Sequence, residues 1–370
     1  MKKYKNIYVA ATSQHIGKTT TTLGLISAFH EKGVNVGYCK PVGQQYVNIQ
    51  NHKVDKDTIL FADLLGFDIE PEIHSPIIFS RGTTEHLIEN RHDLELEPIL
   101  LDAAKELNKR HDLTIYEGTG HPGVGTIANL SNARVAKILN AGVIMVVEGG
   151  IGRTIDMLHM STALFREEGV PIVGVIVNKV WEDKADKIRH YLSLFMNDHN
   201  IPLLGILPYD KTLAYPLVRT VCGAIKGDVI KHEENLNNKV SNVLGGSIID
   251  LNEFKASEDM LLVASARLAD RAISKVIAFS NLMDLDDSPL SGIVITGNEA
   301  ISDDSNRYID KYKIPLIRTK LDTYGVTVKI SRIEVKINRR TPWKVRRAIE
   351  LVQQNVDLDK IANILDSQNV

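Results

Sequence analysis

Ala10-Ala-Thr-Ser-Gln-His-Ile-Gly-Lys-Thr-Thr20 is the stretch that decides the fold of this chain of 370 residues. It follows an apolar run, Asn6–Ala10, that is typical of a buried strand, and it precedes Thr20–Phe29, whose pattern predicts a helix. A strand, a tight loop that ends in Gly17-Lys18-Thr19 and a helix together predict a phosphate-binding loop.

The chemistry of a phosphate-binding loop accounts for these residue types. Backbone N–H groups and the helix dipole at a helix N-terminus attract an anion, and Gly17 lets the backbone close around it. Lys18 can reach the β- and γ-phosphates, and the Thr19 hydroxyl can ligate Mg²⁺. The first glycine of the general pattern is replaced by Thr12, but the strand–loop–helix context still favours nucleotide binding. The loop residues predicted to bind the nucleotide are Thr12, Ser13, Gln14, His15, Ile16, Gly17, Lys18, Thr19 and Thr20.

Composition places the chain among ordinary globular proteins. Hydrophobic residues make up 44% and charged residues 24%, and the length predicts two domains. A net charge of −2 gives no reason to expect nucleic acid or a membrane as partner. Cys39 and Cys222 lie far apart, which favours reduced thiols in a cytoplasmic protein over a disulfide. We find neither a signal peptide nor an apolar run of the roughly 18 residues that cross a membrane.

Polar residues follow the second predicted strand, Val34–Cys39. Lys40 lies directly after it, where ligands bind in open parallel sheets, although a surface lysine before a turn is the alternative. Asp55 and Asp57 stand at the start of a short amphipathic helix. Capping of that helix and coordination of Mg²⁺ both require a carboxylate here, so both interpretations stay open for the two residues.

Two further strands end in polar residues. The apolar run from Asp112 ends in Glu117-Gly118, as does the strand that carries the metal-linked carboxylate in P-loop enzymes. The run Ile172–Val180 contains Asn178, whose amide can hydrogen-bond the edge of adenine. Strands alternate with helical patterns over residues 1–210, which predicts an α/β fold with a doubly wound, mostly parallel sheet.

The pattern changes after residue 210. Residues 211–335 contain shorter strands, each with a helix beside it, and predict a second, smaller α/β domain. Residues 336–370 predict a separate C-terminal helical segment, with one helix over Thr341–Leu365. Its start is basic, which favours a solvated helix face over an anion or partner site.

The order of these motifs is specific to a known group. Residues 1–210 resemble the dethiobiotin synthetase-like group of P-loop enzymes in six successive landmarks, from the loop and Lys40-Pro41-Val42 to Pro-Leu-Leu-Gly-x-x-Pro at 202–208. The chain is most similar to the amino-terminal region of long bacterial phosphate acetyltransferases. In these proteins a DRTGG module follows, which residues 215–330 resemble, with Ala266–Arg271 near the expected GDR-type turn.

The resemblance implies a role for each matched residue. Lys18 and Lys40 would be catalytic, Lys18 by binding the β- and γ-phosphates and Lys40 by stabilising an acyl-phosphate-like or carbamate intermediate. Asn178 would read adenine, with the backbone up to Pro208 nearby. Magnesium would be held by Thr19, Asp57 and Glu117. The resemblance also implies a homodimer, because this group usually builds its acceptor site across a two-fold interface.

The leading hypothesis is an Mg-ATP-dependent, ligase-like enzyme that acts on an unidentified carboxylate or carbamate acceptor. The alternative is a regulatory protein that senses the nucleotide without efficient turnover. Dethiobiotin synthesis itself is disfavoured by Gln44, because synthetases carry a small hydroxyl residue there. A partitioning ATPase is disfavoured too, since Thr12-Ser13 occupies the place of its second lysine. With no acetyltransferase domain recognised up to Val370, we do not expect acetyl transfer.

Overall fold

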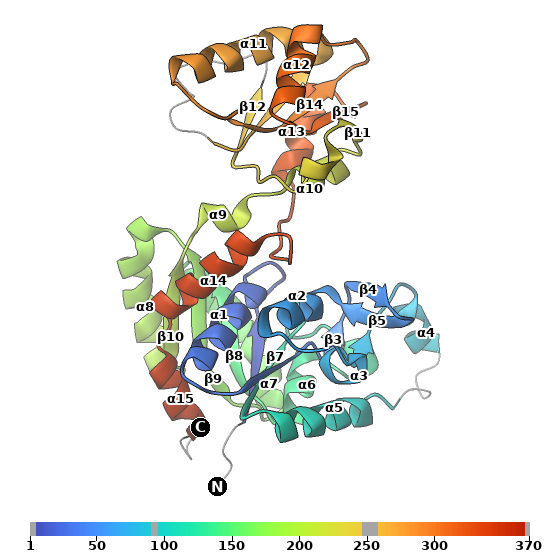
Figure 1. Cartoon of the computed structure of the whole chain (residues 1–370). Helices are drawn as coiled ribbons and strands as arrows, with labels where there is room; N and C mark the ends of the chain where they lie inside the picture. The colour runs from blue at the N-terminus through green and yellow to red at the C-terminus, as the bar shows by residue number, and fades with distance from the viewer. Residues whose placement is uncertain (1–4, 90–94, 246–257, 367–370) are drawn as a thin grey trace. The chain divides into compact units, whose positions relative to one another are not determined.

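The computed structural model describes residues 5–89, 95–245 and 258–366 (Figure 1). The chain divides into two compact units. Unit 1 contains Met1–Asp210 together with Ile337–Val370, and unit 2 contains Lys211–Lys336. No helix within the described ranges is both long and apolar enough to cross a membrane.

A six-stranded sheet forms the centre of unit 1. Its order is β10-β9-β8-β1-β7-β2, and every pairing is parallel. Strands β2 and β7 lie on one side of β1, and the later strands β8, β9 and β10 lie on the other. The strand order therefore reverses at β1, and folds of this kind bind ligands at such a point. This confirms the predicted α/β fold with a parallel sheet. The strands are β1 (Asn6–Ala11), β2 (Val36–Cys39), β7 (Leu113–Glu117), β8 (Gly142–Glu148), β9 (Ile172–Val180) and β10 (Leu203–Pro208).

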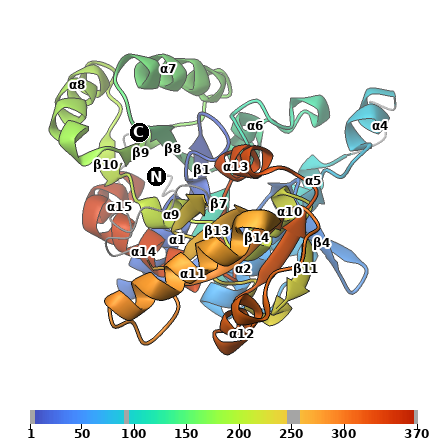
Figure 2. The same ribbon diagram turned by 90° about the horizontal axis from the view of Figure 1, so that it is seen from above.

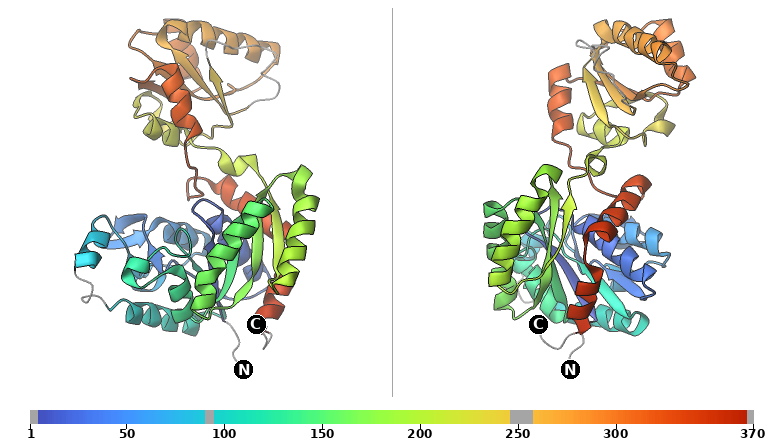
Figure 3. Two further views of the ribbon diagram at one scale, coloured as in Figure 1. Left: turned by 180° about the vertical axis from the view of Figure 1, so that it is seen from behind. Right: turned by 90° about the vertical axis from the view of Figure 1, so that its left-hand side faces the viewer.

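Helices cover both faces of this sheet, which explains why its strands are nearly continuous apolar runs (Figure 3). One face packs against α5 (Glu97–Arg110), α6 (Asn132–Ile138), α7 (Gly152–Glu167) and α8 (Ala185–Asp198). The other packs against α1 (Lys18–Glu31), α2 (Lys56–Leu65), α14 (Pro342–Asn355) and α15 (Leu358–Asp366).

The C-terminal segment is helical, as the sequence predicted, but it is neither one continuous helix nor separate from the first unit. It forms two helices, α14 and α15, and both bury apolar residues in the core of unit 1. The break lies at Val356, which bridges to Gly205 of β10, while the amide of Asp357 donates to Leu204 O at 2.8 Å. Pairing of this backbone with the sheet edge interrupts the helical hydrogen bonds.

Short elements surround the second strand. A hairpin of β4 (Tyr46–Ile49) and β5 (His52–Asp55) precedes α2, which starts at Lys56 with Asp55 and Asp57 at its beginning, as the sequence predicted. The other short elements of unit 1 are β3 (Val42–Gly43), paired with β6 (Ile77–Ile78), α3 (Pro71–His74), α4 (Thr83–Glu89) and two 3₁₀ turns, Thr126–Ala128 and Glu182–Lys184.

Unit 2 is a smaller α/β unit. Its sheet has the order β11-β15-β14-β13-β12, with only β11 antiparallel to its neighbour. The strands are β11 (Asp228–Lys231), β12 (Asn242–Gly245), β13 (Met260–Ser265), β14 (Leu290–Thr296) and β15 (Leu316–Thr319). Helices α11 (Ala266–Leu282) and α12 (Asp303–Lys311) pack on one face, and α10 (Val218–Ala224) and α13 (Thr323–Ser331) on the other (Figure 2). Short α9 (Lys211–Ala214) and the 3₁₀ turn Glu233–Asn235 complete it. Ala266–Arg271, expected near a turn, forms the start of α11.

Candidate functional site

The phosphate-binding loop connects β1 to α1, as the sequence predicted. Gly17 has a φ of 112°, in the left-handed region that favours glycine. A Cβ at this position would also lie 2.1 Å from Asn178 Nδ2, so a side chain has no room there. Asn178 donates from Nδ2 to Ile16 O at 2.7 Å. Asn178 therefore braces the loop from the end of β9, a role that the sequence did not suggest, while its contact with adenine stays a prediction.

Lys18 joins the loop to the turn that follows β7. Its Nζ donates to Ser13 O at 3.1 Å and to Gly120 O at 2.8 Å, and the side chain is largely buried. An ammonium held by two carbonyl oxygens can exchange them for phosphate oxygens, which are stronger acceptors because they are charged. The structure thus brings the turn after Glu117 next to the loop, as a shared sheet edge requires.

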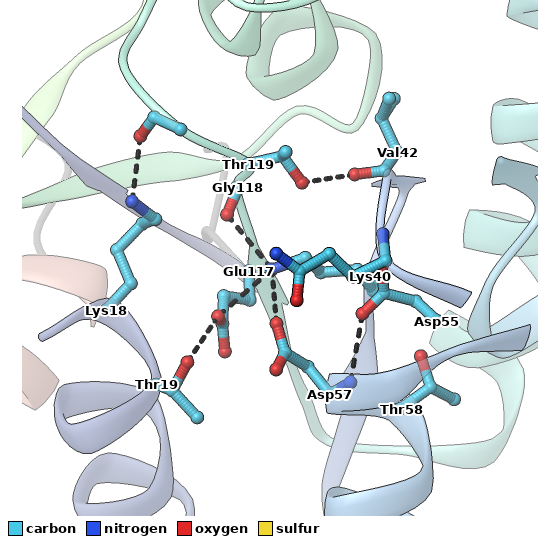
Figure 4. A network of polar contacts seen from close by, with 12 residues as sticks. Lys18, Thr19, Lys40, Val42, Asp55, Asp57, Thr58, Glu117, Gly118 and Thr119 are labelled. Carbon is cyan, nitrogen blue, oxygen red and sulfur yellow. Dashed lines mark hydrogen bonds and ion pairs between the residues drawn. The ribbon is translucent and has the colours of Figure 1, made fainter. Parts of the chain in front are cut away.

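Lys40 lies at the centre of a buried polar network (Figure 4). Its Nζ donates to Asp57 Oδ2 at 2.9 Å, to Glu117 Oε1 at 3.0 Å and to Gly118 O at 3.2 Å. These three acceptors match the three N–H donors of an ammonium. Burial by itself lowers the pKa of Lys40, but the carboxylates of Asp57 and Glu117 outweigh it, so the pKa is raised and the lysine stays charged. The alternative of a surface lysine is wrong.

Glu117 has one satisfied and one unsatisfied oxygen. Oε1 accepts from Lys40 and from Thr19 Oγ1, the latter at 2.9 Å. Oε2 is buried and has no hydrogen-bond partner among the described residues. Burial raises the pKa of Glu117, and Lys40 opposes that rise. Because a buried carboxylate oxygen without a partner is costly, this atom is suited to receive a cation.

The two aspartates beside α2 have different surroundings. Asp55 is the N-cap: its Oδ1 accepts from the amide of Asp57 at 2.9 Å and its Oδ2 from the amide of Gln45 at 3.3 Å. Burial raises its pKa, which Lys40 opposes. Asp57 instead contacts Lys40 and belongs to the network around Glu117. The geometry therefore favours capping for Asp55 and the site for Asp57.

The oxygen donors present fit a magnesium ion. Thr19, Asp57 and Glu117 offer a hydroxyl and two carboxylates, which are the hard ligands that Mg²⁺ prefers. Within the described ranges, no group of three or more His, Cys, Asp and Glu side chains is arranged to hold a metal alone. Two carboxylates suffice for Mg²⁺ when substrate phosphates and water complete its coordination.

Asn132 organises the turn Gly118–His121, and the sequence analysis missed it. Its Oδ1 accepts from Tyr8 Oη at 2.6 Å and from Thr119 N at 3.1 Å. Its Nδ2 donates to Thr119 O at 2.8 Å and to His121 O at 2.6 Å. The only signal in the sequence was Ser131-Asn132 at a helix start, where Ser131 supplies the cap and Asn132 is readily taken for a second capping residue.

The other predicted residues lie around this network. Thr12, Ile16 and Thr20 are buried in or beside the loop, whereas Gln14 and His15 are exposed at its tip. Pro208 ends β10 beside β9. Gln44 is exposed.

Comparisons with known proteins agree with this geometry. A family model described as an AAA domain matches residues 5–216. The chain is 32% identical over 192 residues to the ATP-dependent dethiobiotin synthetase of Clostridium kluyveri, covering 48% of this chain and 76% of that protein. It is 24% identical over 387 residues to the phosphate acetyltransferase of Acinetobacter baylyi, covering 95% of this chain and 51% of that protein.

The chain therefore spans about half the length of the phosphate acetyltransferases that it matches. Among solved structures, the MinD cell division protein of Aquifex aeolicus matches with 13% identity and a TM-score of 0.37, over 57% of this chain and 84% of that one. The extent of the family match decides the family. The chain belongs to the AAA-domain family of P-loop proteins, and its first unit is dethiobiotin synthetase-like.

Proposed function

We propose that this protein binds Mg-ATP and acts as a ligase-like enzyme that phosphorylates a carboxylate or carbamate acceptor. The observation that carries the proposal is the position of the Lys40 ammonium, which lies within hydrogen-bond distance of both Glu117 and Asp57. A phosphoryl transferase needs a positive charge at this edge, next to the loop that binds the phosphates.

The residues of the loop would bind and orient the nucleotide. The N-terminus of α1 would receive the phosphates, and Lys18 would exchange its contacts with Ser13 O and Gly120 O for phosphate oxygens. Asn178 and the backbone at Pro208 would bind adenine at the ends of β9 and β10. Positioning of this kind contributes much of the rate in phosphoryl transfer.

Lys40 would act on the acceptor side of the γ-phosphate. Its ammonium would neutralise charge that develops on the transferring group and on the attacking oxygen. A magnesium ion, held by Thr19, Asp57 and Glu117, would neutralise charge on the β- and γ-phosphates when bound. The acceptor half of the site has no recognisable signature, and we propose that a homodimer completes it.

Nucleotide sensing is the second candidate function, and one observation favours it. Similarity to the phosphate acetyltransferase of Acinetobacter baylyi extends over 95% of this chain and therefore includes unit 2. Similarity to the dethiobiotin synthetase of Clostridium kluyveri covers only 48% of the chain. In this alternative, ATP occupies the same loop with slow hydrolysis, and a partner responds to the bound state.

Replacement of Lys40 by alanine distinguishes the two functions. For an enzyme, Lys40→Ala leaves ATP affinity within a few-fold and lowers turnover by about 10²-fold, because such groups act mainly in the transition state. For a sensor, the same change weakens ATP binding and leaves slow hydrolysis unchanged. The assays are calorimetry with Mg-ATP and ATP turnover with a panel of carboxylate and amine acceptors. Lys53→Ala, on the exposed part of β5, is the control. Weakened binding with unchanged turnover would refute the enzyme.

A further inference from the structure

Lys40 occupies the space between the two carboxylates that were assigned to the metal. Asp57 Oδ2 and Glu117 Oε1 both lie within 3.0 Å of its Nζ, Asp57 in the first turn of α2 and Glu117 at the end of β7. A divalent cation that uses the same two oxygens would have to share that space with an ammonium. Two cations cannot occupy one position, because their repulsion in a buried environment is strong.

We propose that the Lys40 ammonium is an internal substitute for the metal ion, and that it must leave the two carboxylates before a divalent cation can bind there. This inference rests on the proposed function, because it concerns the same site, and it adds how metal binding is controlled. Without nucleotide, the lysine satisfies the carboxylates and excludes the metal. With nucleotide, the γ-phosphate offers the ammonium another anionic partner.

The charges of the network support this exchange. Two carboxylates and one ammonium leave a net charge of −1, so half of the carboxylate charge is already neutralised before any metal arrives. Lys40 has side-chain exposure of 5% and Glu117 of 1%, which leaves little solvent to screen a second cation. All three N–H donors of Lys40 are engaged, since Gly118 O accepts the third. The ammonium is therefore held in place until another acceptor is available.

The oxygen atoms of the site are already grouped around the Lys40 ammonium. Both oxygens already converge on one point, and Thr19 Oγ1 lies 2.9 Å from Glu117 Oε1. The buried Oε2 of Glu117, unpaired among the described residues, provides an additional ligand atom. Withdrawal of one side chain, Lys40, thus converts a closed ion-pair network into an oxygen site for Mg²⁺ or Mn²⁺.

The test is the affinity of the nucleotide-free chain of 370 residues for Mn²⁺, measured by electron paramagnetic resonance of the unbound ion. Removing a buried positive charge about 3 Å from both carboxylates should raise this affinity at least about tenfold in Lys40→Met. Lys137→Met is the matched control: it removes a lysine paired with Glu168 at 3.2 Å on the surface. Its Mn²⁺ affinity should equal that of the wild type. Adding Glu117→Gln to Lys40→Met should abolish the gain.

Thermal stability provides the second measurement. Lys40→Met lowers the melting temperature if the two carboxylates repel each other once the ammonium is gone. Added Mn²⁺ must then restore the melting temperature of the variant, and this increase must exceed the increase that Mn²⁺ causes in the wild type. A variant that stays destabilised in saturating Mn²⁺, or one with wild-type Mn²⁺ affinity, overturns the inference. If the inference fails in this way but the wild type still binds Mn²⁺-ATP, the proposed function stands. If the wild type does not bind Mn²⁺-ATP, the proposed function itself is refuted.

Discussion

Asn132→Ala offers the sharpest test of how the site is built. The side chain makes four hydrogen bonds that join β1, the start of α6 and the turn after β7. Alanine removes all four and leaves Tyr8 Oη, a buried phenol, without a partner. A buried polar group left unpaired costs about 1–3 kcal/mol, and the three half-buried bonds to the turn add a few tenths each after water replaces them. We therefore expect a loss of about 2–4 kcal/mol in the free energy of unfolding of unit 1.

Tryptophan fluorescence during urea unfolding can measure this loss in unit 1 alone. The chain has two tryptophans, Trp181 and Trp343, and both belong to unit 1. Asn6→Ala is the matched control, because Asn6 is an equally buried asparagine with one hydrogen bond, from Nδ2 to Leu139 O at 2.7 Å. Its loss should be about 1 kcal/mol.

The reasoning fails if Asn132→Ala costs no more than Asn6→Ala. A double-mutant cycle with Tyr8→Phe gives a further check, since the two residues share the bond of 2.6 Å. We expect a coupling energy of about 1 kcal/mol between them. A coupling near zero would show that the turn, rather than Tyr8, depends on Asn132.

Four other predictions follow from the site and the fold. Mg-ATP at about 100 times its dissociation constant should stabilise the chain by about 2.7 kcal/mol, and an unchanged melting temperature would remove the nucleotide assignment. Glu117→Gln and Asp57→Asn should weaken Mg²⁺-dependent ATP binding, whereas Asp55→Asn should lower stability and leave metal dependence unchanged; calorimetry over a range of Mg²⁺ concentrations can separate them. A chain truncated after residue 210 should lose cooperative unfolding, because it lacks α14 and α15; circular dichroism during urea unfolding decides this. Light scattering at micromolar concentration should give the mass of a dimer, and a monomeric mass would contradict that proposal.

The fold and the centre of the site could be predicted because both depend on local patterns. Continuous apolar runs alternating with helical patterns identify a parallel sheet covered on both faces. The carboxyl ends of parallel strands share one edge, so Lys40 after β2 and Glu117 at the end of β7 had to lie close together. In the structure, Lys40 Nζ and Glu117 Oε1 lie 3.0 Å apart. The phosphate-binding loop could also be predicted, because its residues stand between an apolar strand pattern and a helix pattern that are both local in the sequence.

Features that depend on distant partners could not be predicted. Asn132 contacts Tyr8, which lies 124 positions earlier in the chain, and nothing in the residues around it indicates this partner. Asp55 and Asp57 are both suitable as caps and as ligands, and only their partners in the structure distinguish them: backbone amides for Asp55 and Lys40 for Asp57. The hairpin before α2 was hidden because its strands are short and half exposed, so their pattern carries little periodicity.

The C-terminal helices show why a boundary at residue 210 does not separate independent pieces of this protein. Helix α14 packs on α1, the helix that carries Lys18 and Thr19. The approach is so close that a Cβ at Gly24 would lie 2.2 Å from Val352 Cβ, so this crossing needs glycine. The orientation of the helix behind the phosphate-binding loop thus depends on residues that follow unit 2 in the chain. Four large apolar side chains of α14 and α15 are buried, namely Leu351, Val352, Ile361 and Leu365. At roughly 1.5–3 kcal/mol each, their burial is comparable to the net stability of a typical domain. Unit 1 therefore has its complete core only when the chain has passed through unit 2 and returned.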